Sequence, residues 1–96
     1  MITEVAFVTV LEGQETAFLA ALDEACKNVL ARAAGFVSFE VHRCIERPST
    51  FMFLIKWETL EDHTVGFRGG PLFTEWRGYI GPFFAEPPLV EHWAAS

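Results

Sequence analysis

The apolar residues of this chain switch between the two-residue repeat of a strand and the three-to-four-residue repeat of a helix. The order of these switches predicts a strand, a long helix, two strands, a helical stretch and a final short strand. The predicted ranges are 2–10, 15–34, 36–44, 51–57, 58–80 with a break at 69–71, and 89–93. This β-α-β-β-α-β order is that of an α+β, ferredoxin-like subunit, in which helices cover one face of an antiparallel sheet.

Charges and turn residues support both helical segments. Acidic Glu15 begins the first helix, Arg32 lies near its end and Gly35 suits the position just beyond it, in agreement with the helix dipole. In the second segment, Thr59 and Asp62 have the three-residue spacing of a capping box. The segment 81–88 is predicted to be a loop.

Length and composition predict one domain over residues 1–96, with an apolar surface that is buried against a partner. Hydrophobic residues make up 51% of the chain and include 10 Phe, more apolar area than one small core needs. The predicted strands are also apolar on both faces, while helices can cover only one face. The second face is therefore expected to pack against another copy in a C2 homodimer.

The charge balance and the cysteines limit location and partners. The formal charge of -6 disfavours nucleic acid and membrane surfaces as partners. The first residues have no basic, signal-like region, and no apolar run reaches transmembrane length. Cys26 and Cys44 have no metal-binding spacing and are interpreted as reduced thiols of a cytoplasmic protein.

Four segments carry a resemblance to a known family: LEGQETAF, AAGFVSFEVHR, FLIKWETLEDH and EPPLVEHW. In these the chain resembles the antibiotic biosynthesis monooxygenase family, whose members share the dimeric α+β barrel fold. The resemblance implies oxygenation of small phenolic or quinol-type aromatics without a cofactor in many members, haem breakdown in some and unassigned roles in most.

The match to the family's site residues is partial. Trp57 matches a Trp that usually packs beside the pocket, whereas the family's His nine residues later is Gly66 here. His63 lies nearly one helical turn earlier, so it could serve the same cavity or miss it. The haem-degrading members resemble the chain in outline, but Ala6, Gly66 and Trp76 occupy the places of their characteristic Asn, Trp and His, which argues against haem.

Oxygenation without metal or flavin requires a substrate that itself donates an electron to O2, a dry aromatic pocket and a proton acceptor. His63 is the candidate catalytic base, because its pKa range suits neutral pH and it lies in the aromatic helical stretch. An ordinary helix position is the equally weighted alternative. His42 and His92 are interpreted as structural residues, His92 through a cross-strand hydrogen bond, and the three histidines form no metal set. No metal or cofactor is predicted.

Residues 64–79 combine glycines, arginines and aromatic side chains. Arg68 is a candidate to hold an anionic substrate oxygen. The other candidate substrate-binding residues are aromatic: Trp57 as a wall, then Phe67, Phe73, Trp76 and Tyr79. The alternative is that the glycines only break a helix and the aromatics are core.

Two other functions remain open for the same chain. One is a non-catalytic, small-ligand-binding or stress-associated dimeric module. The other is an isomerase or lyase in which the histidine moves a proton and O2 plays no part.

Overall fold

The computed structural model describes residues 1–96 and confirms the ferredoxin-like order. The two helices are α1 (Glu15–Asn28) and α2 (Pro71–Ile80). The four strands are β1 (Ile2–Thr9), β2 (Phe36–Arg43), β3 (Thr50–Trp57) and β4 (Leu89–Trp93). They form one antiparallel sheet in the order β2-β3-β1-β4. No helix is both long and apolar enough to span a membrane.

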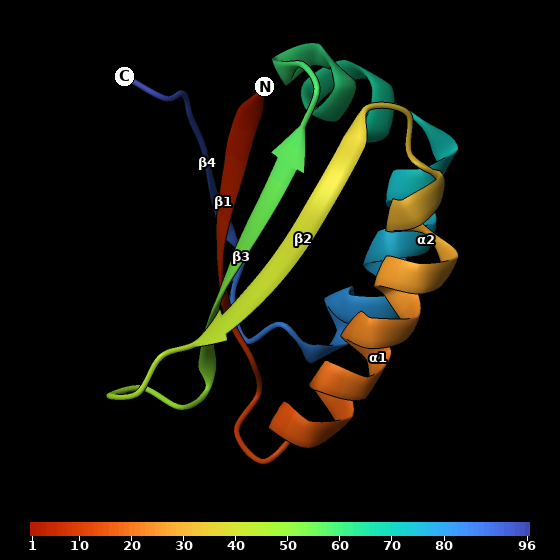
Figure 1. Ribbon diagram of the computed structural model, residues 1–96. Helices are drawn as coiled ribbons and strands as arrows, with labels where there is room; N and C mark the ends of the chain where they lie inside the picture. The colour runs from red at the N-terminus through yellow and green to blue at the C-terminus, as the bar shows by residue number, and fades with distance from the viewer.

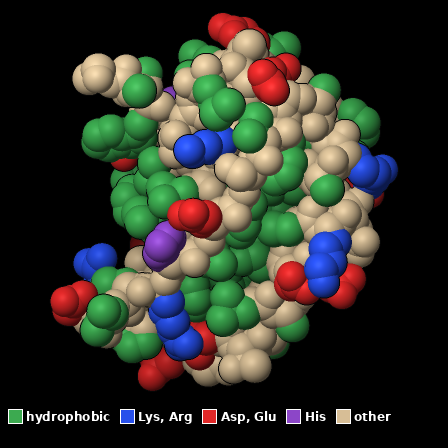
Figure 2. All heavy atoms as spheres, in the orientation of Figure 1, with side chains coloured by type: hydrophobic (Ala, Val, Ile, Leu, Met, Phe, Trp, Pro, Cys, Tyr) green, Lys and Arg blue, Asp and Glu red, His purple; other side chains and the backbone are tan.

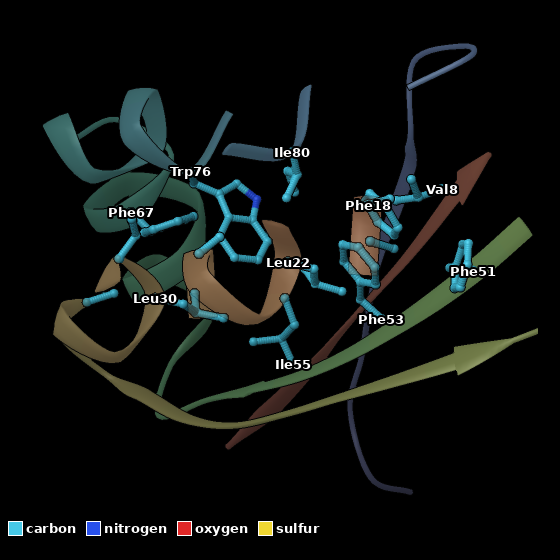
Figure 3. Packing of buried hydrophobic residues seen from close by; sticks show 14 of the residues in the cluster. Val8, Phe18, Leu22, Leu30, Phe51, Phe53, Ile55, Phe67, Trp76 and Ile80 are labelled. Carbon is cyan, nitrogen blue, oxygen red and sulfur yellow. The ribbon is translucent and has the colours of Figure 1, made fainter. Parts of the chain in front are cut away.

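The molecule has two layers, with α1 and α2 on one face of the sheet (Figure 1). The two-residue repeat of β3 directs four buried side chains toward the helices: Phe51, Phe53, Ile55 and Trp57. Phe18 of α1 packs on two of them, with ring centroids 5.1 Å from Phe51 and 6.2 Å from Phe53. In Figure 3 Trp76 and Ile80 of α2 extend this core toward the sheet.

Helix α1 is shorter than its apolar repeat predicts. It ends at Asn28 and is followed by a 3-10 turn, Leu30–Arg32, in which Leu30 is fully buried. The turn continues the apolar face, so periodicity alone does not reveal the change of helix type. The predicted loop 81–88 similarly contains a 3-10 turn, Gly81–Phe83.

The helical stretch after β3 contains a π-helix, η2 (Asp62–Phe67). The predicted capping box is confirmed: the Asp62 N–H donates to Thr59 Oγ1 at 3.1 Å, and the Thr59 N–H donates to Asp62 Oδ2 at 3.2 Å. The wider turn of η2 is seen where the Arg68 N–H donates to the His63 carbonyl at 2.9 Å, five residues back. π-helical turns are frequent at functional sites.

The other face of the sheet, called the open face below, is uncovered; its apolar residues lie on β1, β3 and β4, whereas β2 presents Ser38, Glu40 and His42 there. Leu89 and Trp93 of β4 are 59% and 60% exposed, and Phe7 lies between Leu89 and Met52 in the strand register. Figure 2 shows hydrophobic side chains along the side of the molecule away from the helices. The expectation of apolar strands on both faces therefore holds for β1, β3 and β4 but not for β2.

Gly35 and Gly13 form a matched pair for testing how the start of β2 is built. Both have positive φ, +81° and +87°, but a Cβ on Gly35 would overlap the Asp62 side chain, whereas a Cβ on Gly13 meets nothing within 4 Å. We expect Gly13→Ala to cost about 1 kcal/mol from backbone strain alone. Gly35→Ala should cost about 3 kcal/mol, because the steric overlap adds to that strain. Urea unfolding measures both, and equal losses would contradict this packing.

Candidate functional site

A cavity of about 290 Å³ lies between the helix-covered face of the sheet and the segment that contains η2 and α2. Ten of its sixteen lining residues are hydrophobic, and they include Phe53, Phe67, Phe73, Trp76 and Phe84. Its charged or polar lining residues are Glu4, His63, Arg68 and Arg77. The size is at the lower end for small-molecule sites, and the apolar walls with a few polar groups are typical of them.

Glu4 is a carboxylate on the buried face of β1. The two-residue repeat places it on the same face as Ala6 and Val8, and it is only 6% exposed. Trp57 Nε1–H donates to Glu4 Oε1 at 2.9 Å, and His63 Nε2 lies 3.3 Å from the same oxygen. Burial raises the pKa of Glu4, and the Trp57 hydrogen bond and the charge of Arg68 oppose this rise only in part.

His63 of η2 is 3% exposed and is held by three elements. Its ring stacks on Trp57 of β3, with centroids 5.3 Å apart and planes at 22°. Its Nδ1 lies 2.8 Å from Nε2 of His92, which pairs with Glu4 in the β1–β4 register. Burial, helped by the charges of Arg68 and His92, lowers the pKa of His63 to about 4, so the imidazole is neutral at pH 7.

The hydrogen-bond directions follow from which groups can donate. The Trp57 indole only donates, and a neutral imidazole has one N–H. With Glu4 ionised, its Oε1 accepts from Trp57, and the negative charge 3.3 Å from His63 Nε2 favours the tautomer with the proton on Nε2, so that Nδ1 accepts the His92 Nε2–H.

The second carboxylate oxygen, Glu4 Oε2, has a different environment from Oε1. Oε2 has no hydrogen-bond partner in the protein. Every buried side-chain oxygen in the structure has such a partner, so Oε2 is not a buried atom. Oε2 is therefore not sealed in the protein, and Glu4 lines the cavity. A carboxylate in the wall of an apolar cavity can accept a proton from a bound molecule.

Most of the residues singled out from the sequence lie in the cavity wall: His63, Phe67, Arg68, Phe73 and Trp76. Trp57 is fully buried behind His63 and does not line the cavity. Tyr79 does not line it either, which corrects its expected substrate contact. It lies on the exposed side of α2, where its hydroxyl accepts a hydrogen bond from Asn28 Nδ2 of α1 at 3.3 Å.

The remaining histidines differ from each other. His42 is exposed and lies 3.2 Å from Glu40, outside the cavity. His92 makes a hydrogen bond, as the sequence predicts, but its partner is His63 of η2. The structure has no group of three or more His, Cys, Asp or Glu side chains that could hold a metal ion.

Glu4 and Arg77 also lie in the cavity wall, although neither was predicted as a site residue from the sequence. Glu4 could have been found as the one acid on a strand face otherwise formed by Ala6 and Val8. Arg77 gave no signal in the sequence; its guanidinium lies 5.9 Å from the Phe73 ring centroid and 5.5 Å from that of Phe84.

Comparisons with known proteins agree with this fold. Residues 1–79 match the family model described as antibiotic biosynthesis monooxygenase. An uncharacterized protein of Bacillus subtilis, YczJ, is 35% identical over 92 residues, which are 96% of each chain. A solved structure from Bordetella bronchiseptica, given the same family name, is 38% identical with a TM-score of 0.93 and covers 99% of this chain and 96% of its own.

A more distant similarity is limited to the fold. A monooxygenase of Streptomyces coelicolor, solved in complex with nanaomycin D, is 16% identical with a TM-score of 0.82, over 99% of this chain and 87% of its own. The family match covers most of the chain, including β1, η2 and most of α2. The chain belongs to the antibiotic biosynthesis monooxygenase family.

Proposed function

We propose that this protein is a cofactor-independent monooxygenase that oxidises a small phenolic, quinol-type or anthrone-like aromatic with O2. The observation that carries the proposal is the aromatic-walled cavity whose wall contains one buried carboxylate–imidazole pair, Glu4 and His63. Membership of the family supports it, and so does the small organic ligand, nanaomycin D, in the Streptomyces coelicolor relative.

The cavity has what this chemistry requires. Phe67, Phe73 and Trp76 offer ring surfaces to an aromatic substrate and keep water out. The guanidinium of Arg68 makes no ion pair or hydrogen bond within the chain, so it is available to a substrate oxyanion. The Glu4–His63 pair accepts the proton that the substrate must lose before it can give an electron to O2.

The reaction balances without a reductant. A ring methylene and O2 give a ring carbonyl and water: the carbon loses two hydrogens, one oxygen atom enters the product and the other leaves as water. The substrate supplies all four electrons that reduce O2.

A proton-transfer isomerase or lyase is the second candidate, because the Glu4–His63 pair could move a proton without O2. A purely binding module is less well supported. A buried carboxylate in the wall would weaken the binding of an apolar ligand, and a protein that only binds such a ligand has no use for a proton acceptor there.

The open face is the proposed site of a C2 homodimer, because a second copy would cover its apolar residues. We expect light scattering to give the mass of a dimer. Trp93→Glu should weaken association at least 100-fold, because the symmetry buries two new charges in one interface. Val65→Glu is the control, since Val65 is exposed on η2, away from the open face. A monomeric wild type at micromolar concentration would contradict the dimer.

Oxygen uptake over a panel of hydroquinones, naphthols and anthrones tests the function. We expect uptake by the metal-stripped protein. His63→Ala should lower kcat at least tenfold with little change in KM, because it disrupts the proton-accepting pair. Tyr79→Phe should leave both unchanged, because Tyr79 lies on the exposed side of α2 and outside the cavity. Unchanged turnover in His63→Ala would remove His63 from the mechanism.

A further inference from the structure

We infer that Glu4 is the catalytic base of this site, that it takes the substrate proton through Oε2, and that His63, His92 and Trp57 are positioning residues for it. The inference rests on the proposed function and assigns the proton acceptor within it. It differs from the expectation that His63 itself removes the proton.

The close contacts of both His63 ring nitrogens argue against it as the group that contacts the substrate proton. Its Nδ1 is 2.8 Å from His92 Nε2, and its Nε2 is 3.3 Å from Glu4 Oε1. Both ring nitrogens are thus occupied by protein partners. A substrate could give a proton to this ring only after one of these contacts had broken.

The carboxylate of Glu4 has the opposite arrangement. Oε1 is engaged by Trp57 from β3 and by His63 from η2, which fixes the plane of the carboxylate. Oε2 has no protein partner and Glu4 lines the cavity, so this oxygen is left for a bound molecule. A carboxylate that is held through one oxygen, by the Trp57 hydrogen bond and the His63 contact, keeps its second oxygen available as a base.

The surrounding charges also favour Glu4 as the base. The titratable groups around it and in the same cavity wall are His63 of η2, His92 of β4, Arg68 after η2 and Arg77 of α2, and of these the two arginines carry a charge at pH 7. Burial is the largest influence and raises the pKa of Glu4, which makes it a stronger base than an exposed carboxylate. The pKa of His63, lowered to about 4, makes the imidazole a weak one.

The proton path can be written so that every atom is accounted for. Glu4 Oε2 takes one proton from the ring methylene, and the carbanion reacts with O2 to form a peroxide anion on that carbon. Glu4 returns the proton to the outer peroxide oxygen. It then takes the second methylene proton as the O–O bond breaks and gives it to the departing hydroxide, so a carbonyl and one water result and Glu4 is again ionised.

The test separates proton removal from the reaction with O2. Anthrone has an exchangeable methylene, and its deuterium incorporation in D2O without oxygen is followed by proton NMR; oxygen uptake is measured separately. Glu4→Gln keeps an oxygen that can accept from Trp57 and His63, so it removes the base with little change in shape. We expect both exchange and uptake to fall at least 100-fold, with KM little changed.

The His63 variants test the positioning role. His63→Gln keeps a side-chain N–H donor and should retain more activity than His63→Ala. The acid limb of the kcat/KM profile should move to higher pH in His63→Ala, because the carboxylate loses a stabilising donor. Glu4→Asp keeps the carboxylate on a shorter side chain and should retain part of the exchange. It is the control for misfolding, because a loss of activity caused by misfolding at this position would affect both Glu4 variants.

The outcomes distinguish the role of Glu4 as the base from the proposed monooxygenase activity. Full exchange and uptake in a folded Glu4→Gln, with loss in His63→Ala, would overturn the role of Glu4 and leave the monooxygenase proposal standing. Exchange that depends on Glu4 without oxygen uptake would support Glu4 as the base and overturn the monooxygenase proposal. A wild type that neither exchanges anthrone nor takes up oxygen with any compound of the panel would overturn both.

Discussion

The buried Glu4 carboxylate is the constraint around which this site is built. Removing a carboxylate from water is costly unless donors replace the water. A hydrogen bond to a charged group contributes about 1.5–3 kcal/mol, so the indole of Trp57 offsets part of that cost, and the imidazole of His63 lies 3.3 Å from the same oxygen. These partners come from β3 and η2, and His92 of β4 holds His63 in turn. The site therefore forms only when distant parts of the chain have folded together.

The π-helix η2 connects this hydrogen-bond chain to the cavity. Its wide turn carries His63 and Phe67 into the cavity wall and ends at Arg68, whose amide is bound to the His63 carbonyl. The capping box of Thr59 and Asp62 fixes where the helical segment begins. One short segment thus supplies an imidazole, a ring surface and a guanidinium to the same space, which is the combination that an ionisable aromatic substrate needs.

Much of the fold could be predicted because each element has a clear apolar repeat, and because the Thr59–Asp62 spacing has a local physical meaning. The π-helix could not, since six residues are too few to separate its repeat from that of an α-helix. The aromatic stretch indicated a pocket, but not that Tyr79 lies on the exposed side of α2. The role of Glu4 depends on contacts between β1, β3 and η2, which no local pattern contains.

The protonation of the two histidines tests the central claim most directly, and nitrogen-15 NMR measures it in the wild-type protein. The account predicts that His63 carries its proton on Nε2, has a bare Nδ1 and stays neutral down to about pH 4. His92 should likewise carry a proton on Nε2. A proton on Nδ1 of His63 at pH 7 would mean that its Nε2 accepts from Glu4, so that Glu4 already holds a proton. That result would contradict the account.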